Sequence, residues 1–280
     1  MKKHAGVSKF ARAATAAEAQ ALARAVAAGD NGNLREAERI ARDVLARSPR
    51  HLEALQLLGA LLMAQKRPRE AIVPLEDAAC RSANPELETY LAIALREIGR
   101  TDEALVWLYR AIERQPVYAR AFQELGNLLR AKRRYVEAKS VLKRGVEAAP
   151  TVPELSLALG GVCLDRADSP GAKIAFARAL LILPGNADAL VGFGVALQYE
   201  GNFARAAERF RRVLEREPGH HCARMNLGYC LMELGDEGIV SLRAAVQAAP
   251  HNYGSALRML TRRARTILAQ GQRGCAVSDA

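Results

Sequence analysis

The residues best suited to chemistry are the adjacent His220, His221 and Cys222, whose side chains are those that ligate zinc in proteins. His220 does not stand alone in its position, because His51 and His251 also follow a proline by one or two residues. A histidine that recurs at one phase of a repeating pattern is typical of a surface loop. We therefore interpret these histidines as loop residues and expect no bound metal.

The remaining candidates for chemistry are equally sparse. The five cysteines are scattered and form no Cys-x-x-Cys pair, which excludes the usual redox motif and zinc knuckle and fits a reducing compartment. Cys222 and Cys230 lie eight residues apart on one expected helix, too far for an undistorted disulfide. The sequence contains no Walker A loop, nucleophile elbow or His-Glu-x-x-His motif. We expect neither catalysis nor a cofactor.

The composition predicts a helical protein that favours acidic partners. Half of the 280 residues are hydrophobic, and much of this share is alanine and leucine, the strongest helix formers. The net charge of +11 favours nucleic acid, an anionic membrane or an acidic protein as partner. No run of about 18 apolar residues is present to span a membrane. The basic residues 1–17 loosely resemble a mitochondrial presequence, but the expected localisation is cytoplasmic.

A regular period organises the chain. Proline, which ends helices because it lacks an amide donor, recurs every 34 residues at Pro116, Pro150, Pro184 and Pro218. At one phase of this period a small residue lies between two large ones: Leu58-Gly59-x-x-Leu62, Leu91-Ala92-x-x-Leu95, Leu125-Gly126-x-x-Leu129, Leu159-Gly160-x-x-Cys163, Phe193-Gly194-x-x-Leu197 and Leu227-Gly228-x-x-Leu231. Twelve residues after the small residue comes a second one, at Ala71, Ala104, Ala138, Ala172 and Ala206. A large residue follows four positions later, at Leu75, Leu108, Leu142, Phe176 and Phe210.

This spacing predicts a helical hairpin in each period, because the small residue lets the second helix approach the first closely. The pattern resembles the tetratricopeptide repeat family. The resemblance implies an all-α, right-handed superhelical α-solenoid of about seven helix-turn-helix repeats with a C-terminal capping helix. The repeats cover residues 18–252, in units 18–51, 52–84, 85–118, 119–152, 153–186, 187–220 and 221–252. A basic extension at 1–17, a capping helix at 253–270 and a disordered tail at 271–280 complete the expected chain.

Some positions depart from the family pattern. Pro74 falls inside the second helix of its unit, where we expect it to kink or shorten that helix. Cys163 replaces a leucine and is expected to be a small core residue. The fourth position of each unit, often tryptophan in the family, is only loosely filled, by Leu55, Phe122 and Leu190.

The resemblance also implies a binding groove along the first helix of each unit. Carried over onto this sequence, the groove residues are Tyr90, Ile93, Arg96, Gln123, Asn127, Arg130, Val195, Gln198, Met225, Asn226, Tyr229 and Met232. A polar middle followed by an apolar end suits an extended peptide or an amphipathic helix. Met225, Tyr229 and Met232 share one stripe, which is expected either to face a partner or to support packing between neighbouring units.

Two specialised family grooves are not expected. The dicarboxylate clamp for chaperone tails needs further polar residues beyond Asn127, but Leu157 and Ala158 stand there. The asparagine ladder of glycosyltransferase-linked arrays has only Asn226 at its phase. The densest basic run, Arg130 to Arg134 with Lys139, Lys143 and Arg144, is interpreted as a solvated turn and outer helix face, with docking to an acidic partner as the alternative.

The sequence thus predicts a non-catalytic scaffold or adaptor that binds a peptide or helix of a partner protein. Two alternatives are a module cut from a larger transferase-type enzyme and a basic solenoid that binds nucleic acid, although nucleic acid is not the expected partner because aromatic residues are scarce near the basic run.

Overall fold

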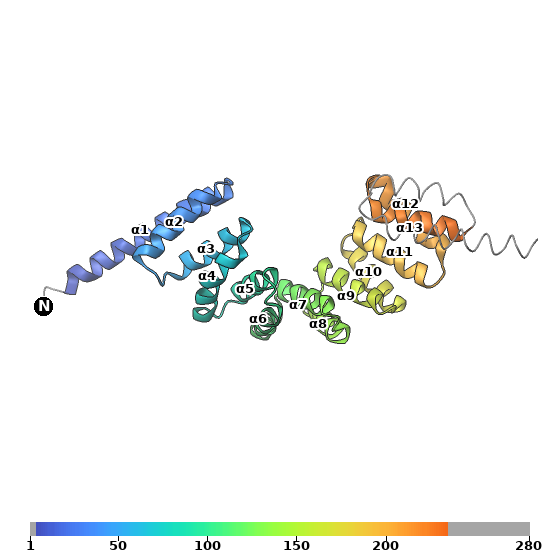
Figure 1. The fold of residues 1–280 in the computed structure, drawn as a ribbon, viewed down its shortest axis with the longest axis horizontal. Coiled ribbons are helices and arrows are strands. Elements are labelled where there is room, and N and C mark those ends of the chain that lie inside the picture. The colour runs from blue at the N-terminus through green and yellow to red at the C-terminus, as the bar shows by residue number, and fades with distance from the viewer. Residues whose placement is uncertain (1–3, 235–280) are drawn as a thin grey trace, which may run out of the picture. The chain divides into compact units, whose positions relative to one another are not determined.

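The computed structural model describes residues 4–234, with side chains from residue 16 onward, and this part of the chain contains helices and no strands (Figure 1). Along these described residues, thirteen helices follow one another: α1 (His4–Asp30), α2 (Leu34–Arg47), α3 (Leu52–Ala64), α4 (Pro68–Arg81), α5 (Pro85–Glu97), α6 (Thr101–Arg114), α7 (Ala119–Ala131), α8 (Tyr135–Ala148), α9 (Pro153–Asp165), α10 (Ser169–Ile182), α11 (Ala187–Tyr199), α12 (Phe203–Arg216) and α13 (His221–Glu233).

The helices belong to two compact units. The first unit extends to Arg133 and includes Glu147–Ala149, whereas the second comprises Arg134–Val146 and the chain from Pro150 onward. In the first unit, α1 packs with α2, α3 with α4 and α5 with α6, while α7 packs on α5 and α6. In the second unit, α9 packs with α10 and α11 with α12, while α13 packs on both α11 and α12. Sequential helical hairpins confirm the all-α repeat fold expected from the sequence.

Parts of the predicted organisation lie outside the described residues. These are the second helix of the seventh unit, the capping helix at 253–270 and the tail at 271–280. At the other end, α1 begins at His4, so no helix boundary separates the expected extension at 1–17 from the first repeat.

The small residues of the repeat mark the places where two helices meet most closely. A Cβ atom at Gly59 would lie 2.5 Å from the side chain of Leu75, and one at Gly194 would lie 2.7 Å from the ring of Phe210. Both distances are below van der Waals contact, so a larger residue at these positions would require the facing side chain to move. The close approach of a small and a large residue, which the sequence pattern predicted, is therefore the packing that holds each hairpin.

A left-handed residue recurs in the turn between the two helices of a hairpin. Positive φ angles occur at Gly32, Lys66, Gly99, Arg133, Ala167 and Gly201, so one such residue stands in each of six successive turns. Glycine adopts this conformation without strain, whereas a residue with a Cβ atom costs roughly 1–2 kcal/mol there. Three of the six turns therefore carry backbone strain.

We expect Ala167→Gly to raise the free energy of unfolding by up to about 1 kcal/mol, because the relief of strain at φ 55° exceeds the added freedom of the unfolded chain. Gly201→Ala, in the next turn at φ 76°, should lower it by about 1–2 kcal/mol. Urea denaturation followed by circular dichroism measures both changes. A loss of stability in Ala167→Gly would show that this turn is not strained.

Pro74 was expected to kink or shorten its helix; the shortening is wrong, and the kink stays a prediction. Helix α4 runs for 14 residues, the same length as α6, with Pro68 at its first turn and Pro74 inside it. Pro74 and the flanking Ala71 and Leu75 are all buried. Proline removes a single amide donor, and the burial of the surrounding residues against neighbouring helices keeps the chain helical through this point.

The fourth position of the repeat is filled in two different ways. Leu55, Phe122 and Leu190 are buried there, as a core position requires. Glu88 and Ser156 occupy the same position in two other repeats and are also buried, with Glu88 0% exposed. A carboxyl group thus stands in the core of the first unit where other repeats have an apolar side chain.

Candidate partner-binding site

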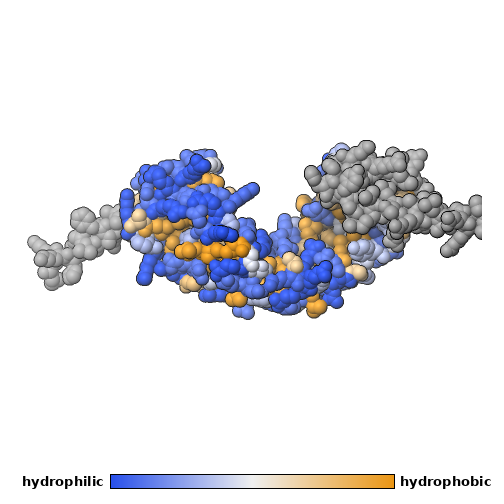
Figure 2. All heavy atoms as spheres, in the orientation of Figure 1, coloured by the Kyte–Doolittle hydropathy of each residue, from blue (hydrophilic) through white to orange (hydrophobic). Residues whose placement is uncertain are grey.

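The first helices of the hairpins, α3, α5 and α7 in the first unit and α9, α11 and α13 in the second, contact one another in sequence. Each unit therefore has a face made of adjacent first helices, which we name the first-helix face. The predicted groove residues lie on these helices. Figure 2 shows hydrophobic side chains among hydrophilic ones at the surface of both units.

The first-helix face of the first unit is polar, and its side chains are tied together. The guanidinium of Arg120 on α7 lies 4.8 Å from the ring centroid of Tyr90 on α5 and donates a hydrogen bond of 3.3 Å to the Tyr90 hydroxyl. Arg96 on α5 forms a 2.5 Å ion pair with Glu124 on α7. The predicted groove residues Tyr90 and Arg96 thus join neighbouring repeats, and Arg96 already has an acidic partner within the chain.

Exposure on this face differs from the prediction at one residue. Gln123 and Arg130 are half-buried and Asn127 is exposed, so these three side chains remain accessible. Ile93 is 8% exposed, because α5 is packed between α3 and α7. Its expected role in facing a ligand needs correction, since Ile93 belongs to the core.

The first-helix face of the second unit is largely apolar. Val191 and Val195 on α11 are half-buried beside the core, and Tyr199 at the end of the same helix is 57% exposed. On α13, Met225 and Tyr229 are half-buried, and the Tyr229 ring meets that of Phe203 edge to face with centroids 5.8 Å apart. Apolar surface therefore reaches solvent on two adjacent first helices. Tyr199, which the sequence also places on the groove side, lies on the same helix as Val195.

The amide side chains of this face are used within the chain. The Gln198 amide donates to the Asn226 carbonyl oxygen and to Cys230 Sγ, each at 3.1 Å, and so bridges α11 and α13. The Asn226 amide donates at 2.8 Å to the carbonyl oxygen of Cys222, one turn earlier in its own helix. Both predicted groove residues stabilise the array, and their role toward a ligand stays a prediction.

The exposed stripe predicted on α13 is only partly present. Met225 and Tyr229 are accessible, but Met232 is 4% exposed. The expectation that all three residues face away from the core is therefore wrong for Met232, and changes there would affect packing.

The candidate metal-binding residues have a structural role that the sequence did not reveal. His220 Nδ1 accepts a 3.2 Å hydrogen bond from the backbone N–H of Ala223, and His51 Nδ1 accepts one of 3.4 Å from Ala54. These histidines are the N-caps of α13 and α3, a role usually filled by Ser, Thr, Asp or Asn. No group of three His, Cys, Asp or Glu side chains suited to a metal occurs among residues 16–234.

The buried cysteines are unsuited to redox or nucleophilic chemistry. Cys163 is 1% exposed, which confirms the prediction of a small core residue. Burial raises the pKa of its thiol, and burial raises the pKa of Cys230 to about 11. Both thiols therefore stay protonated at neutral pH, and the thiolate is the reactive form. Cys222 and Cys230 are not bonded to each other.

The basic run is largely engaged in ion pairs, in accord with its interpretation as a turn and outer helix face. Lys132 pairs with Asp102, Arg134 pairs with Glu137 at 2.6 Å, and Lys139 pairs with Asp168 at 2.5 Å. Lys139 lowers the pKa of the Asp168 carboxyl, which also caps α10 by accepting from the Gly171 N–H. These cations connect parts of the chain rather than forming a patch of unpaired charge.

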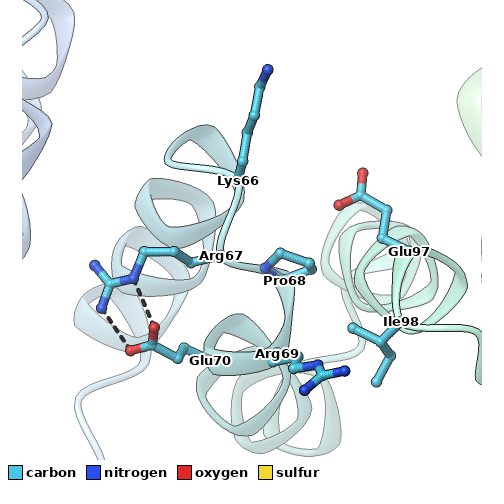
Figure 3. A pocket seen from close by; sticks show the side chains of 7 residues that line it. All are labelled: Lys66, Arg67, Pro68, Arg69, Glu70, Glu97 and Ile98. Atoms are coloured by element: carbon cyan, nitrogen blue, oxygen red, sulfur yellow. Dashed lines mark hydrogen bonds and ion pairs between the residues drawn. The ribbon is translucent and has the colours of Figure 1, made fainter.

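A cavity of 430 Å³ lies at the hairpin turns of the first unit, and none of the predicted groove residues lines it (Figure 3). Its walls are mostly charged, and Arg67 and Glu70 pair through two hydrogen bonds of 2.7 and 2.6 Å. Lys66 and Glu97 extend from its rim (Figure 3). The repeat pattern does not predict this cavity, because the cavity depends on how successive turns align.

Parts of this chain are similar in sequence to the repeats of known proteins. The model described as "Tetratricopeptide repeat" matches residues 22–88 and 191–253. The general transcriptional corepressor trfA of Dictyostelium discoideum is 28% identical over 137 residues, which is 48% of this chain and 10% of that protein. The chain spans only about a tenth of the length of the curated relatives it matches. Within residues 4–234, no helix is long and apolar enough to cross a bilayer.

Solved structures show the same fold. A tetratricopeptide repeat protein from Parabacteroides merdae ATCC 43184 has a TM-score of 0.65 at 16% identity, covering 88% of this chain and 98% of that one. YrrB, described as "a TPR protein with an unusual peptide-binding site", has a TM-score of 0.55 at 24% identity, covering 67% and 97%. The matched repeats, the sequential helical hairpins and the close small-to-large contacts identify the chain as a tetratricopeptide repeat protein.

Proposed function

We propose that this chain is a non-catalytic scaffold that holds a peptide or helix of a partner protein on its first-helix faces. One observation carries the proposal: Val195, Tyr199, Met225 and Tyr229 leave an apolar surface partly open on adjacent helices of the second unit. A contiguous apolar surface on a protein of this kind usually marks a contact site. The peptide-binding site named for YrrB supports the same type of ligand.

The residues favour a ligand that contributes apolar side chains. Tyrosine supplies a large contact area with a polar tip, and methionine adapts to irregular apolar surfaces. In the first unit, Asn127 and Gln123 provide hydrogen-bonding groups for a polar or extended backbone segment. The chain covers 10% and 13% of its two longer relatives, so their activities do not enter the proposal.

The test compares two pairs of substitutions in capture of partners from a native lysate. Tyr199→Ser with Met225→Ser removes accessible apolar groups from the first-helix face of the second unit. We expect the partner recovered by the wild type to bind at least about tenfold more weakly, a loss of about 1.4 kcal/mol. Quantitative mass spectrometry of the captured proteins measures this change.

The matched control is Val73→Ser with Val106→Ser. These residues are 73% and 66% exposed on the second helices α4 and α6, away from the first-helix face. The control should retain the partner, and both variants should keep the thermal midpoint of the wild type. Equal loss of the partner in the two variants would contradict the proposed site, because the effect would then not depend on which face was changed.

A further inference from the structure

Each first helix of the second unit has one stripe of accessible residues along it. The four members of a stripe follow one another at intervals of three, four and four residues, so they share one side of the helix. All are exposed or half-buried: Glu154, Leu157, Gly161 and Asp165 on α9, Asp188, Val191, Val195 and Tyr199 on α11, and Cys222, Met225, Tyr229 and Glu233 on α13. Because α11 contacts both α9 and α13, the three stripes are neighbours on the first-helix face.

The stripes have an uncharged middle and acidic ends. None of their central members is charged, and all but Gly161 have a side chain that offers apolar surface. Glu154 and Asp188 stand at the beginning of their stripes, and Asp165 and Glu233 stand at the end of theirs. The first-helix face of the second unit is therefore an apolar strip with carboxylates along both edges.

The carboxylates at these edges are available to a ligand. Glu154, Asp188 and Glu233 are exposed and form no ion pair among the residues that the structure describes. The only lysine or arginine on α9, α11 and α13 is Arg224, whose guanidinium donates to the carbonyl oxygen of Pro218 in the preceding loop.

The sign of the charge on this face is opposite to that of the whole chain. The second helices α10 and α12 carry seven basic and two acidic side chains, whereas the first helices α9, α11 and α13 carry one basic and four acidic ones. The net charge of +11 favours an acidic partner for the chain as a whole, but it does not describe the first-helix face of the second unit.

We propose that the first-helix face of the second unit binds a basic amphipathic helix of a partner protein. This inference rests on the function proposed above and names the chemistry of the ligand. Apolar side chains of the ligand pack on the strip, and its lysine or arginine side chains reach the carboxylates at the two edges. An acidic helix, a nucleic acid or an anionic membrane would bring like charge to these carboxylates.

The dimensions of the strip suit a helix. The first and last members of a stripe are separated by about 16 Å along the helix axis, whereas an α-helix with its side chains is about 10–12 Å wide. A ligand helix that crosses α9, α11 and α13 therefore fits between the two acidic edges. Lysine and arginine side chains on its flanks are long enough to reach both edges while their stems cover apolar surface.

Fluorescence anisotropy with the full chain tests the proposal. The probes are two labelled peptides of about 18 residues, or five helical turns. One has leucine on one side and lysine on the other, and the second has glutamate in place of every lysine. We expect the leucine–lysine peptide to bind at least about tenfold more tightly than the leucine–glutamate peptide. General attraction to a chain of charge +11 would give the opposite order.

Substitutions at the two edges locate the peptide. Asp188→Asn with Glu233→Gln removes two carboxylates and should weaken binding of the leucine–lysine peptide about tenfold. Asp188→Lys with Glu233→Lys should reverse the preference in favour of the leucine–glutamate peptide, which also shows that the variant is folded. The matched control is Glu208→Gln with Glu215→Gln, which removes two exposed carboxylates from α12 and should leave binding unchanged.

The proposal is wrong if the leucine–lysine peptide does not bind, if the leucine–glutamate peptide binds as tightly, or if the control loses as much affinity as the edge variant. It is also wrong if Tyr199→Ser with Met225→Ser leaves binding of the leucine–lysine peptide unchanged, because the peptide would then be held elsewhere. The proposed function fails separately, when that same pair of substitutions leaves capture from the lysate unchanged. A dimer in sedimentation that Asp188→Asn with Glu233→Gln breaks, without peptide binding, would assign the face to a second copy of the chain instead.

Discussion

Replacing Gly192 by alanine is expected to destabilise the protein by about 2–3 kcal/mol, although the same change inside a helix normally stabilises it by about 1 kcal/mol. The reversal of sign comes from one aromatic ring. A Cβ atom at Gly192 on α11 would lie 2.3 Å from Cζ of Phe176 on α10. The ring cannot retreat, because Gly160 on α9 faces it as well, with a Cβ there 2.6 Å from the same atom.

Urea denaturation measured by circular dichroism gives the change, with Gly29→Ala as control. A Cβ at Gly29 would make an ordinary 3.5 Å contact with Leu61, so this variant should not lose stability. Phe176→Leu should make Gly192→Ala nearly neutral, because Leu108 stands at the equivalent position of Phe176 and the residue equivalent to Gly192 is there the larger Glu124. If Gly192→Ala instead stabilises the wild type, the close approach of α10 and α11 is wrong.

The contacts between the two helices of one hairpin are where prediction from sequence succeeded. The recurrence of a small residue and, sixteen positions later, a large one identified the pairs Gly59 with Leu75 and Gly160 with Phe176. Both members of each pair lie within one hairpin, so a single repeat contains the information that places them. Contacts of this local kind repeat with the period, and the period is visible in the sequence.

The candidate site was predicted less well, because exposure on the first-helix face depends on neighbouring repeats. Ile93 and Met232 have the phase of groove residues but are buried. The side chains of Arg96 and Gln198 form hydrogen bonds with residues of the next repeat, 28 residues or more away in the sequence. Both contacts join the twelfth position of one unit to the sixth position of the next, but the residue types at these positions differ between units, so the repeat pattern does not predict them.

Removing the two arginines that pair with Glu88 is expected to cost about 3–5 kcal/mol at neutral pH, because a buried carboxylate would be left without a cation. Glu88 is 0% exposed; its Oε1 accepts a hydrogen bond from Arg114 Nε at 2.7 Å and forms an ion pair with Arg110 Nε at 3.0 Å. Its Oε2 has no hydrogen-bond donor among the described residues. Arg110→Met with Arg114→Met keeps the apolar stems of both side chains and removes only their charge.

The loss should depend on pH in a defined direction. Burial raises the pKa of Glu88, while Arg114 and Arg110 lower it in part. Without the arginines the folded-state pKa rises further, so the folded protein binds the proton more tightly than the unfolded chain does. Stability then decreases as pH rises from the ordinary carboxyl pKa through the raised one. The double variant should therefore approach the wild type in acid and fall behind it toward neutral pH, as urea denaturation at several pH values would show.

Glu88→Leu provides the opposite test of the same ion pairs. Leucine is the residue found at the equivalent positions Leu55 and Leu190, both buried. The freed guanidiniums of Arg110 and Arg114 are 41% and 32% exposed and can turn to water, so no buried charge remains unpaired. We expect this variant to be more stable than the wild type by about 1–2 kcal/mol at neutral pH and to lose the pH dependence assigned to Glu88. A marked loss of stability in Glu88→Leu would mean that the ion pairs stabilise the fold by more than burial of the carboxylate destabilises it. That result would contradict the expectation for a fully buried charge.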